Sequence, residues 1–435
     1  MLESLRAILH KHRKDTITLL LLMVIGTGLF APMMHRWRLM GDYTVHNNLA
    51  YNLIEDAGDF FRNVPHFLYH VLTATSYQMA SDGDIYVAGV RVMVLSYLVL
   101  IGLIYWRIRY ASQFPDTYFV LGLSAILSLG LMLLAPITFF TPDNRYFGYF
   151  VPNVYHNPTV NLMKPFAFGL FFASLRLYTS KDKIAWRWIV LYALLTGLAL
   201  VAKPSFILSF VPTLGLITAF FMLRHLPSVW NSRNIDESLF AMLLRYVRTM
   251  SVNLPVLIGG IVIPSFAILI YQALTWTSSG GISFEPLRVF HEWTLQYDPD
   301  ADKLIAFKFI MSAAFPIVVY GLHLKSASRS LMFNMAWLNF IISVLYAYLL
   351  VDNTVIAAGD FGWSAQMGVF LLHVVSVLFL FRHYRPLIET ESITTKAKII
   401  WIACAVVFLL HVISGISWYV AHLANTDLEL IYGIW

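Results

Sequence analysis

The sequence has few charged side chains and a single cysteine. Charged residues make up 12% of the 435 residues, whereas a soluble globular chain carries roughly 25%. So few charges cannot cover a water-soluble body of this size. Cys404 has no partner for an intramolecular disulfide and lies in an apolar run, where it fits packing. These deficits exclude a soluble enzyme, a disulfide scaffold and a disordered chain.

Nucleotide-binding motifs are also missing from the sequence. It contains neither a P-loop nor a GxGxxG loop. Activated nucleotide sugars and ATP are therefore not expected as direct ligands. The net charge of +6 does not indicate nucleic acid as a partner, because in a membrane protein such an excess usually reflects basic cytoplasmic loops.

Long apolar runs are what the sequence has in abundance. Hydrophobic residues make up 59% of the chain, and a helix needs about 20 of them in succession to cross a ~30 Å hydrocarbon core. We therefore predict an all-α polytopic membrane protein, with one transmembrane domain over residues 1–435 and about 11 transmembrane helices. The predicted spans cover 16–34, 86–106, 117–138, 159–178, 186–201, 204–223, 254–274, 304–322, 331–350, 366–381 and 398–420.

The distribution of basic residues predicts the orientation. With the N-terminus in the cytoplasm, 20 of the 30 Lys and Arg residues fall on the cytoplasmic side, as the positive-inside rule requires. An odd number of spans then places the C-terminus outside. The sequence Asn157-Pro158-Thr159 is disqualified as a glycosylation site by its proline, and no other N-x-S/T site occurs in the sequence. This favours a bacterial inner membrane over the endoplasmic reticulum.

Two of the predicted outer loops are long. The first, residues 34–84, contains two amphipathic stretches, one following Gly41-Asp42 and one following Pro65. Helices of this kind lie flat at the membrane interface. The second, residues 275–303, is rich in acidic side chains, for which we expect a solvated loop. Polar chemistry is thus predicted to gather on the outer face.

Two Lys-Pro pairs stand near the outer ends of predicted spans. Lys164-Pro165 and Lys203-Pro204 each precede an apolar run. Proline fits the first turn of a helix, and a helix N-terminus offers free N–H groups and a positive dipole. The two pairs together predict an anion site suited to phosphate. The alternative is that both lysines extend to the outer lipid headgroups.

This layout resembles that of the C-type (GT-C) membrane glycosyltransferases. A short N-terminal segment precedes the first span, and the long outer loop that follows carries GDYTVH at 41–46, which puts Asp42 at the place of the family's hallmark acid. Members of the family move a sugar from a polyprenyl-phosphate or polyprenyl-diphosphate carrier to an acceptor on the outer or lumenal face. The resemblance implies a polyprenyl-phosphate sugar donor, membrane lipids as surroundings, and a glycan, lipid or protein acceptor.

The sequence departs from the family at one position. A neighbouring pair of acids is common in the family, but here Tyr43 follows Asp42. No cofactor is therefore fixed by the sequence, and a requirement for a divalent metal stays open. His66 and His70 have the spacing of two metal ligands on one helix face, yet no third ligand stands out, so we predict no metal-binding residues.

Asp42 and His46 are the candidate catalytic residues. Asp42 would take the proton from an acceptor hydroxyl, so that the oxygen attacks the anomeric carbon with inversion. Its alternative role is to cap the first interfacial helix. His46 lies four residues later, hence on the same helix face, where it would orient the carboxylate or contact phosphate.

The candidate substrate-binding residues lie further along the chain. They are Arg145, His156, Asn157, Lys164 and Lys203. Arg145 would clamp a phosphate, or else pair with Asp143. His156 would donate to the leaving phosphate, or else sit at a helix cap. Asp352 and Asp360, in the connection before the tenth span, are weaker candidates for binding an acceptor.

Two other functions remain open at this point. A transporter or lipid flippase usually shows internal repeats and ionisable residues near the midplane, whereas most spans here carry no charge. A polymerase or ligase of lipid-linked glycans would have its principal outer loop late in the chain. The long first loop favours the glycosyltransferase.

Overall fold

The chain folds into a bundle of helices. The computed structural model describes residues 13–80, 83–111, 117–139, 147–180, 185–231, 242, 252–275, 281–297, 299–354, 356–385 and 394–424. Within these residues the regular structure is almost entirely α-helical. Two short strands, β1 (Ile282–Phe284) and β2 (Leu350–Asp352), pair antiparallel with Ser283 opposite Val351. The all-α class is confirmed.

A helix, or a closely spaced set of helices, lies in each of the eleven segments predicted as spans. They are α2 (Arg13–Trp37), α6 (Ile85–Ala111), α7 (Tyr118–Met132), α8 (Pro158–Ser174), α10 (Trp186–Ala202), α11 (Ser205–Asn231), α13 (Leu254–Leu257) with η1 (Ile258–Val262) and α14 (Ile263–Thr275), α16 (Ile305–Ser312) with α17 (Ala314–Leu322), α19 (Leu331–Leu349), α20 (Gly362–His383) and α22 (Thr395–Ala424).

Not all of these helices have the length of a membrane span. Among the described residues, seven helices are long and apolar enough to cross a membrane, and the bent pair α16–α17 is an eighth candidate. The helices α7 and α10 are apolar but have only 15 and 17 residues. A membrane protein with several spans is therefore established, while the number eleven stays a prediction.

The bend between α16 and α17 has a local cause. The two helices meet at 69°. Pro316 lies in the first turn of α17 and has no N–H to bond the carbonyl of Ser312. The helix therefore cannot continue regularly through this position.

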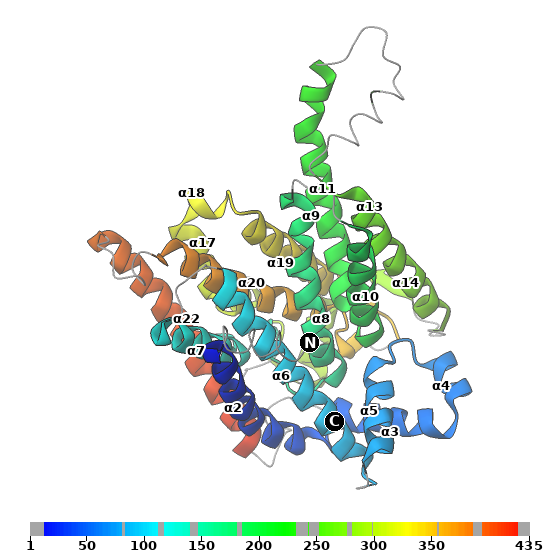
Figure 1. Ribbon diagram of the computed structural model, residues 1–435. Helices are drawn as coiled ribbons and strands as arrows, with labels where there is room; N and C mark the ends of the chain where they lie inside the picture. Colours follow the sequence, from blue (N-terminus) through cyan, green and yellow to red (C-terminus); the bar gives the residue numbers. More distant parts are fainter. Residues whose placement is uncertain are drawn as a thin grey trace.

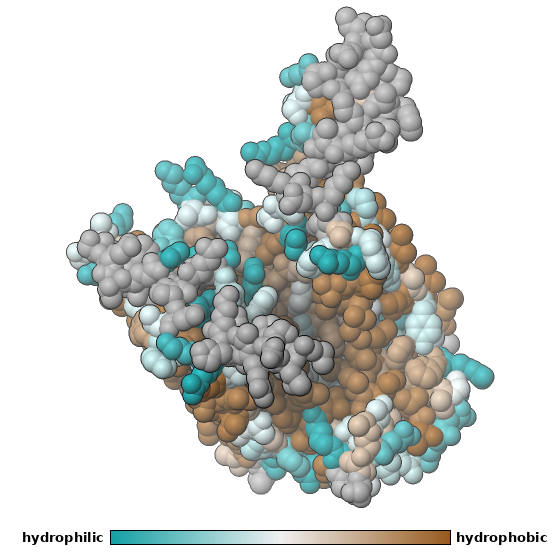
Figure 2. Space-filling view, viewed as in Figure 1, coloured by the Kyte–Doolittle hydropathy of each residue, from teal (hydrophilic) through white to brown (hydrophobic). Residues whose placement is uncertain are grey.

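The middle of the bundle is formed by α20. All of its residues from Trp363 to Phe381 are buried, and it packs against α19, α11, α17 and α6. Protein surrounds it on every side, which is why its sequence is apolar all round. Figure 2 shows an apolar band on the face of the bundle in view, with hydrophilic side chains gathered toward its two ends.

The segment predicted as the first outer loop contains three helices, and not the two that we predicted. They are α3 (Gly41–Glu55), α4 (Ala57–Asn63) and α5 (Leu68–Met79), which lie together at one end of the bundle (Figure 1). The amphipathic stretches correspond to α3 and α5. Because α4 has only seven residues, it is too short to show a helical period. Its start is fixed by Asp56, whose side chain accepts from the backbone N–H of Asp59 at 3.0 Å.

The predicted helix start at Lys164-Pro165 is wrong. The helix α8 begins seven residues earlier, at Pro158, where Asn157 accepts from the N–H of Val160 at 3.0 Å and caps it. Pro165 therefore lies inside α8 and leaves the carbonyl of Asn161 without its helical partner. The hydroxyl of Ser96 donates to that carbonyl at 3.3 Å. The second pair was predicted correctly, since Lys203 ends α10 and α11 begins at Ser205.

The segment 147–157 is irregular but buried, and it delivers His156 and Asn157 to the site. Polar side chains hold its backbone in place. Asn153 Nδ2 donates to the carbonyls of Leu131 and Leu134 at 2.9 and 3.1 Å, and the N–H of Phe150 donates to Ser312 Oγ at 3.0 Å. The remaining described elements are short: α9 (Arg176–Thr179), α15 (Arg288–Gln296), α18 (Leu324–Ala327) and η2 (Ile356–Ala358).

Candidate functional site

Side chains from four distant parts of the sequence converge next to α3. Asp42, in the first turn of α3, accepts a hydrogen bond on Oδ2 from Asn157 Nδ2 at 2.6 Å. Lys203, at the boundary of α10 and α11, lies with its Nζ 3.7 Å from Oδ1 of Asp360. Both Lys203 and Asp360 are close enough to Asp42 to act on its pKa. Three predicted site residues, Asp42, Asn157 and Lys203, thus lie together with Asp360. The sequence had indicated Asp360 only as a weak candidate for binding the sugar acceptor.

The alternative interpretation, in which the Asp42 carboxyl caps α3, is wrong. The N-cap position is occupied by Met40. Burial is the largest influence on Asp42 and raises its pKa above the usual range, and the charge of Asp360 acts in the same direction. Lys203 and the hydrogen bond from Asn157 oppose this rise. The result is a carboxylate of raised basicity with a cation beside it, which is the environment that a general base needs.

Lys203 is held by an acid and an aromatic ring. Its Nζ lies 5.4 Å from the ring centroid of Trp363 as well as near Asp360. Trp363 in turn donates from Nε1 to Asp360 Oδ1 at 3.2 Å. The ammonium is therefore fixed at the N-terminal end of α11, where free backbone N–H groups add to its attraction for an anion.

Three histidines lie together: His46 on α3, His66 in the segment before α5, and His70 in the first turn of α5. The rings of His46 and His70 share a hydrogen bond between Nδ1 and Nε2 at 2.9 Å, and the ring of His66 lies 6.1 Å from that of His46. Burial lowers the pKa of all three, that of His70 to about 3. Two neutral rings can form this bond, because one nitrogen keeps its proton and the other accepts. His46 is therefore hydrogen-bonded to His70, and not to Asp42 as predicted. The described residues contain no group of three side chains suited to a metal ion.

His156 lies between two tryptophans. Its ring centroid is 5.6 Å from that of Trp363 and 6.0 Å from that of Trp37. Burial, followed by the nearby charge of Lys203, lowers its pKa to about 3. His156 is thus a neutral ring beside the Lys203 ammonium, and it belongs to the same site.

Lys164 does not join the site around Asp42 and Lys203, and Arg145 is not among the described residues. Lys164 is fully buried, and its Nζ donates to the carbonyl of Pro152 at 2.9 Å and lies 3.4 Å from Oδ1 of Asn153. It stabilises the segment 147–157, and it does not line the cavity beside Lys203.

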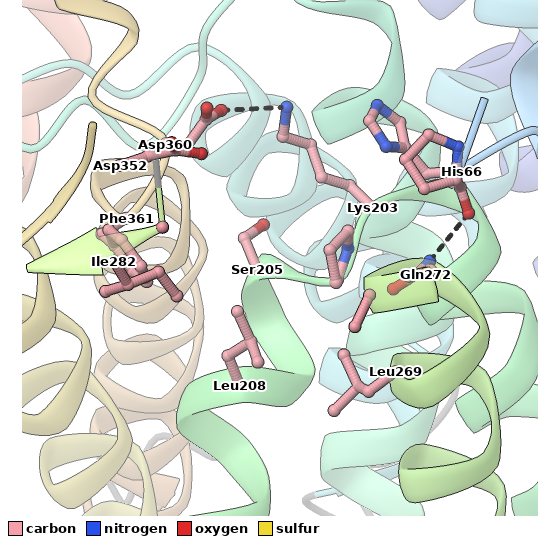
Figure 3. A pocket seen from close by; sticks show the side chains of 14 residues that line it. His66, Lys203, Ser205, Leu208, Leu269, Gln272, Ile282, Asp352, Asp360 and Phe361 are labelled. Atoms are coloured by element: carbon pink, nitrogen blue, oxygen red, sulfur yellow. Dashed lines mark hydrogen bonds and ion pairs between the residues drawn. The ribbon is translucent and has the colours of Figure 1, made fainter. Parts of the chain in front are cut away.

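A cavity of about 450 Å³ opens beside Lys203 (Figure 3). It is lined by Pro65, His66, Lys203, Pro204, Ser205, Leu208, Leu269, Gln272, Ala273, Gly281, Ile282, Asp352, Asp360 and Phe361. Figure 3 shows Lys203, Asp352 and Asp360 at one end, and Leu208 and Leu269 at the other. The cavity therefore suits an amphiphile with a polar head and an apolar chain.

Sequence reasoning missed three features of this site. Asp360 was considered only as a weak candidate for binding an acceptor, because nothing in its segment points to Lys203. The weak signal for His66 was its spacing to His70. Gln272 is a lone amide in an apolar run, a signal that was visible but not used.

Comparisons with protein-family models, curated proteins and solved structures returned no match. The function proposed for the chain therefore depends on the geometry of the site.

Proposed function

We propose that this protein is an outer-face glycosyltransferase that moves a sugar from a polyprenyl-phosphate carrier to a hydroxyl of a glycan, lipid or protein. The observation that carries the proposal is the convergence of Asp42, Asn157, Lys203 and Asp360 beside a cavity with a polar and an apolar end. A half-buried base, a fixed cation and an apolar chamber are the three parts that such a reaction requires.

The reaction assigns a separate role to each part. Asp42 accepts the proton of the acceptor hydroxyl while that oxygen forms a bond to the anomeric carbon. The bond between this carbon and the phosphate oxygen breaks, and polyprenyl phosphate leaves with the electron pair. Lys203 and the N-terminus of α11 stabilise the charge on the leaving phosphate. Attack opposite the leaving group inverts the anomeric centre.

The apolar end of the cavity supports a lipid carrier. Leu208 and Leu269 line it, and α14 presents an exposed apolar face next to it, formed by Ile263, Phe266, Ile270 and Leu274. A prenyl chain entering from the bilayer would remain in apolar surroundings along its whole path.

The proposal includes a membrane topology and a family relationship. With eleven spans and a cytoplasmic N-terminus, the site faces outward, and the basic residues concentrate on the opposite side. The acid after the first span and the interfacial helices support a relationship to the GT-C enzymes. We place the protein in a bacterial inner membrane.

The test is a reconstitution that separates chemistry from transport. The full chain is placed in vesicles with a polyprenyl-phosphoryl sugar labelled on the sugar, and envelope glycan and lipid fractions serve as acceptors. Label appearing in an acceptor, with matching release of bare polyprenyl phosphate, is the expected result. If the intact lipid instead crosses the bilayer unaltered, the protein is a flippase and the proposal is wrong.

A further inference from the structure

Gln272 joins three elements of the cavity wall. It lies on α14 and is 5% exposed. Its Nε2 donates to the carbonyl of Pro65, in the segment between α4 and α5, at 3.0 Å, and to the carbonyl of Leu200, on α10, also at 3.0 Å. The side-chain amide is therefore locked in one orientation.

That orientation leaves an acceptor on the cavity side. Both partners are carbonyl oxygens, which only accept hydrogen bonds, so the amide nitrogen has to face them and Oε1 has to point away. Oε1 of Gln272 has no partner among the described residues. Figure 3 shows this oxygen on the side of the amide that faces the cavity. A buried acceptor without a donor is unfavourable, and a ligand that supplies an O–H or N–H would relieve it.

The opposite wall also presents acceptors. Asp352 and Asp360 both line the cavity, and Figure 3 shows their carboxylates across from Gln272. Lys203 already lies 3.7 Å from Asp360. A polar head that fits here has to bring several hydrogen-bond donors, and a second anionic group on it would meet two carboxylates.

We propose that Gln272 determines specificity in the donor site, its Oε1 accepting a hydrogen bond from a hydroxyl of the donated sugar. The inference rests on the proposed function and narrows its substrate class. The sugar is polyhydroxylated and carries no carboxylate, so hexoses such as glucose or mannose fit and uronic acids do not.

The test compares lipids that differ only in the head. Binding to the purified full chain is measured for a polyprenyl phosphate, for the same lipid carrying glucose or mannose, and for the same lipid carrying glucuronic acid. We expect the parent to bind a neutral-sugar lipid more tightly than the other two. Gln272→Met should weaken binding of that lipid about tenfold and change binding of bare polyprenyl phosphate by less than about twofold.

Two further variants separate recognition from wall structure. Gln272→Lys keeps a donor for the two carbonyls and lacks Oε1, so it should weaken binding of the neutral-sugar lipid relative to bare polyprenyl phosphate, whose binding the added positive charge favours. Gln366→Met is the matched control, because Gln366 is also a buried amide with an unpartnered Oε1 but lines a different cavity, of only about 20 Å³. Its lipid binding should equal that of the parent.

The failures are distinguishable. If Gln272→Met weakens binding of the bare and the glycosylated lipid equally, or of neither, Gln272 does not recognise the sugar. The proposed function would still stand. Equal binding of the glucuronic acid lipid by the parent would overturn the sugar class. A parent that binds no polyprenyl phosphate at all would overturn the proposed function itself.

Discussion

The raised pKa of Asp42 has a cost in folding stability and, in the proposed reaction, a use as a base. A carboxylate whose pKa is raised by burial destabilises the folded state when it is charged, so its contribution to stability is lost as the pH rises through that pKa. The same rise makes it a better base near neutral pH. A protein that needed Asp42 only for structure would gain by replacing it.

We therefore predict that Asp42→Asn lowers turnover about 100-fold or more while folded protein and donor binding are retained. Asparagine keeps the shape and can still accept from Asn157, and it removes the buried charge, so stability at neutral pH should be unchanged or higher. Turnover is measured with the labelled lipid donor, and unfolding by thermal melting. Glu55→Gln, at the exposed end of α3, is the control. Turnover near that of the parent would remove Asp42 from the role of base.

The neighbours of Asp42 predict how activity depends on pH. In the proposed reaction the carboxylate form of Asp42 is the active one, so turnover should fall as the pH is lowered through a pKa above the usual range for aspartic acid. Lys203 lowers this pKa and Asp360 raises it. Lys203→Met should therefore shift the acidic limb to higher pH, and Asp360→Asn should shift it to lower pH. The test is to measure turnover against pH for both variants. Shifts of the acidic limb in the same direction would contradict the assignment of Asp42 as the base.

At the scale of secondary structure, Asn157 serves two elements at once. Its Oδ1 caps α8 through the N–H of Val160, and its Nδ2 donates to Asp42 on α3. The start of one helix and the orientation of the base therefore depend on the same amide. This arrangement fixes the distance between α3 and α8 at the site.

Two substitutions of Asn157 separate these roles. Asp caps helices about as well as Asn, but Asn157→Asp cannot donate to Asp42 and places a like charge beside it. We expect a turnover reduced about tenfold or more, and a thermal stability nearest to that of the parent at acidic pH, where one of the two carboxyls is protonated. Asn157→Ala loses the cap as well and should cost about 1 kcal/mol of stability. Parental turnover in Asn157→Asp would show that the hydrogen bond does not matter for catalysis.

Hydropathy located the helices well but not their ends or their neighbours. Each apolar run contains a helix because the bilayer demands one. The predicted span 159–178 begins within one residue of α8, and the error was to read Lys164-Pro165 as a second helix start, because Asn157-Pro158 and Lys164-Pro165 both have the chemistry of one. The meeting of Asp42 with Lys203 and Asp360 could not be predicted, because contacts between distant helices depend on packing that no local pattern records.

At the scale of the whole molecule, the site and the end of the last helix lie on the same side. The ring of His422 on α22 is 5.5 Å from that of Trp37 at the end of α2, and Tyr419 donates to the carbonyl of Leu29. Since α3 follows directly after α2, the orientation of α22 reports the orientation of the site.

A reporter fused after Trp435 therefore tests the whole topology. We predict that an enzyme active only outside the cytoplasm, such as a periplasmic phosphatase, will be active in this fusion. A reporter fused in the basic connection near Lys181, predicted to lie inside, is the inverse control. Phosphatase activity in the second fusion and not in the first would reverse the topology and place the site on the cytoplasmic side.

The order in which the site residues occur along the chain has a consequence for biosynthesis. Asp42 leaves the ribosome early, Asn157 and Lys203 follow, and Asp360 comes after the greater part of the chain has been made. A nascent chain halted before Asp360 has a base but lacks the acid that holds Lys203. The part of the cavity wall formed by Asp360 and Phe361 is also missing at that stage, so the proposed donor site is completed only late in synthesis.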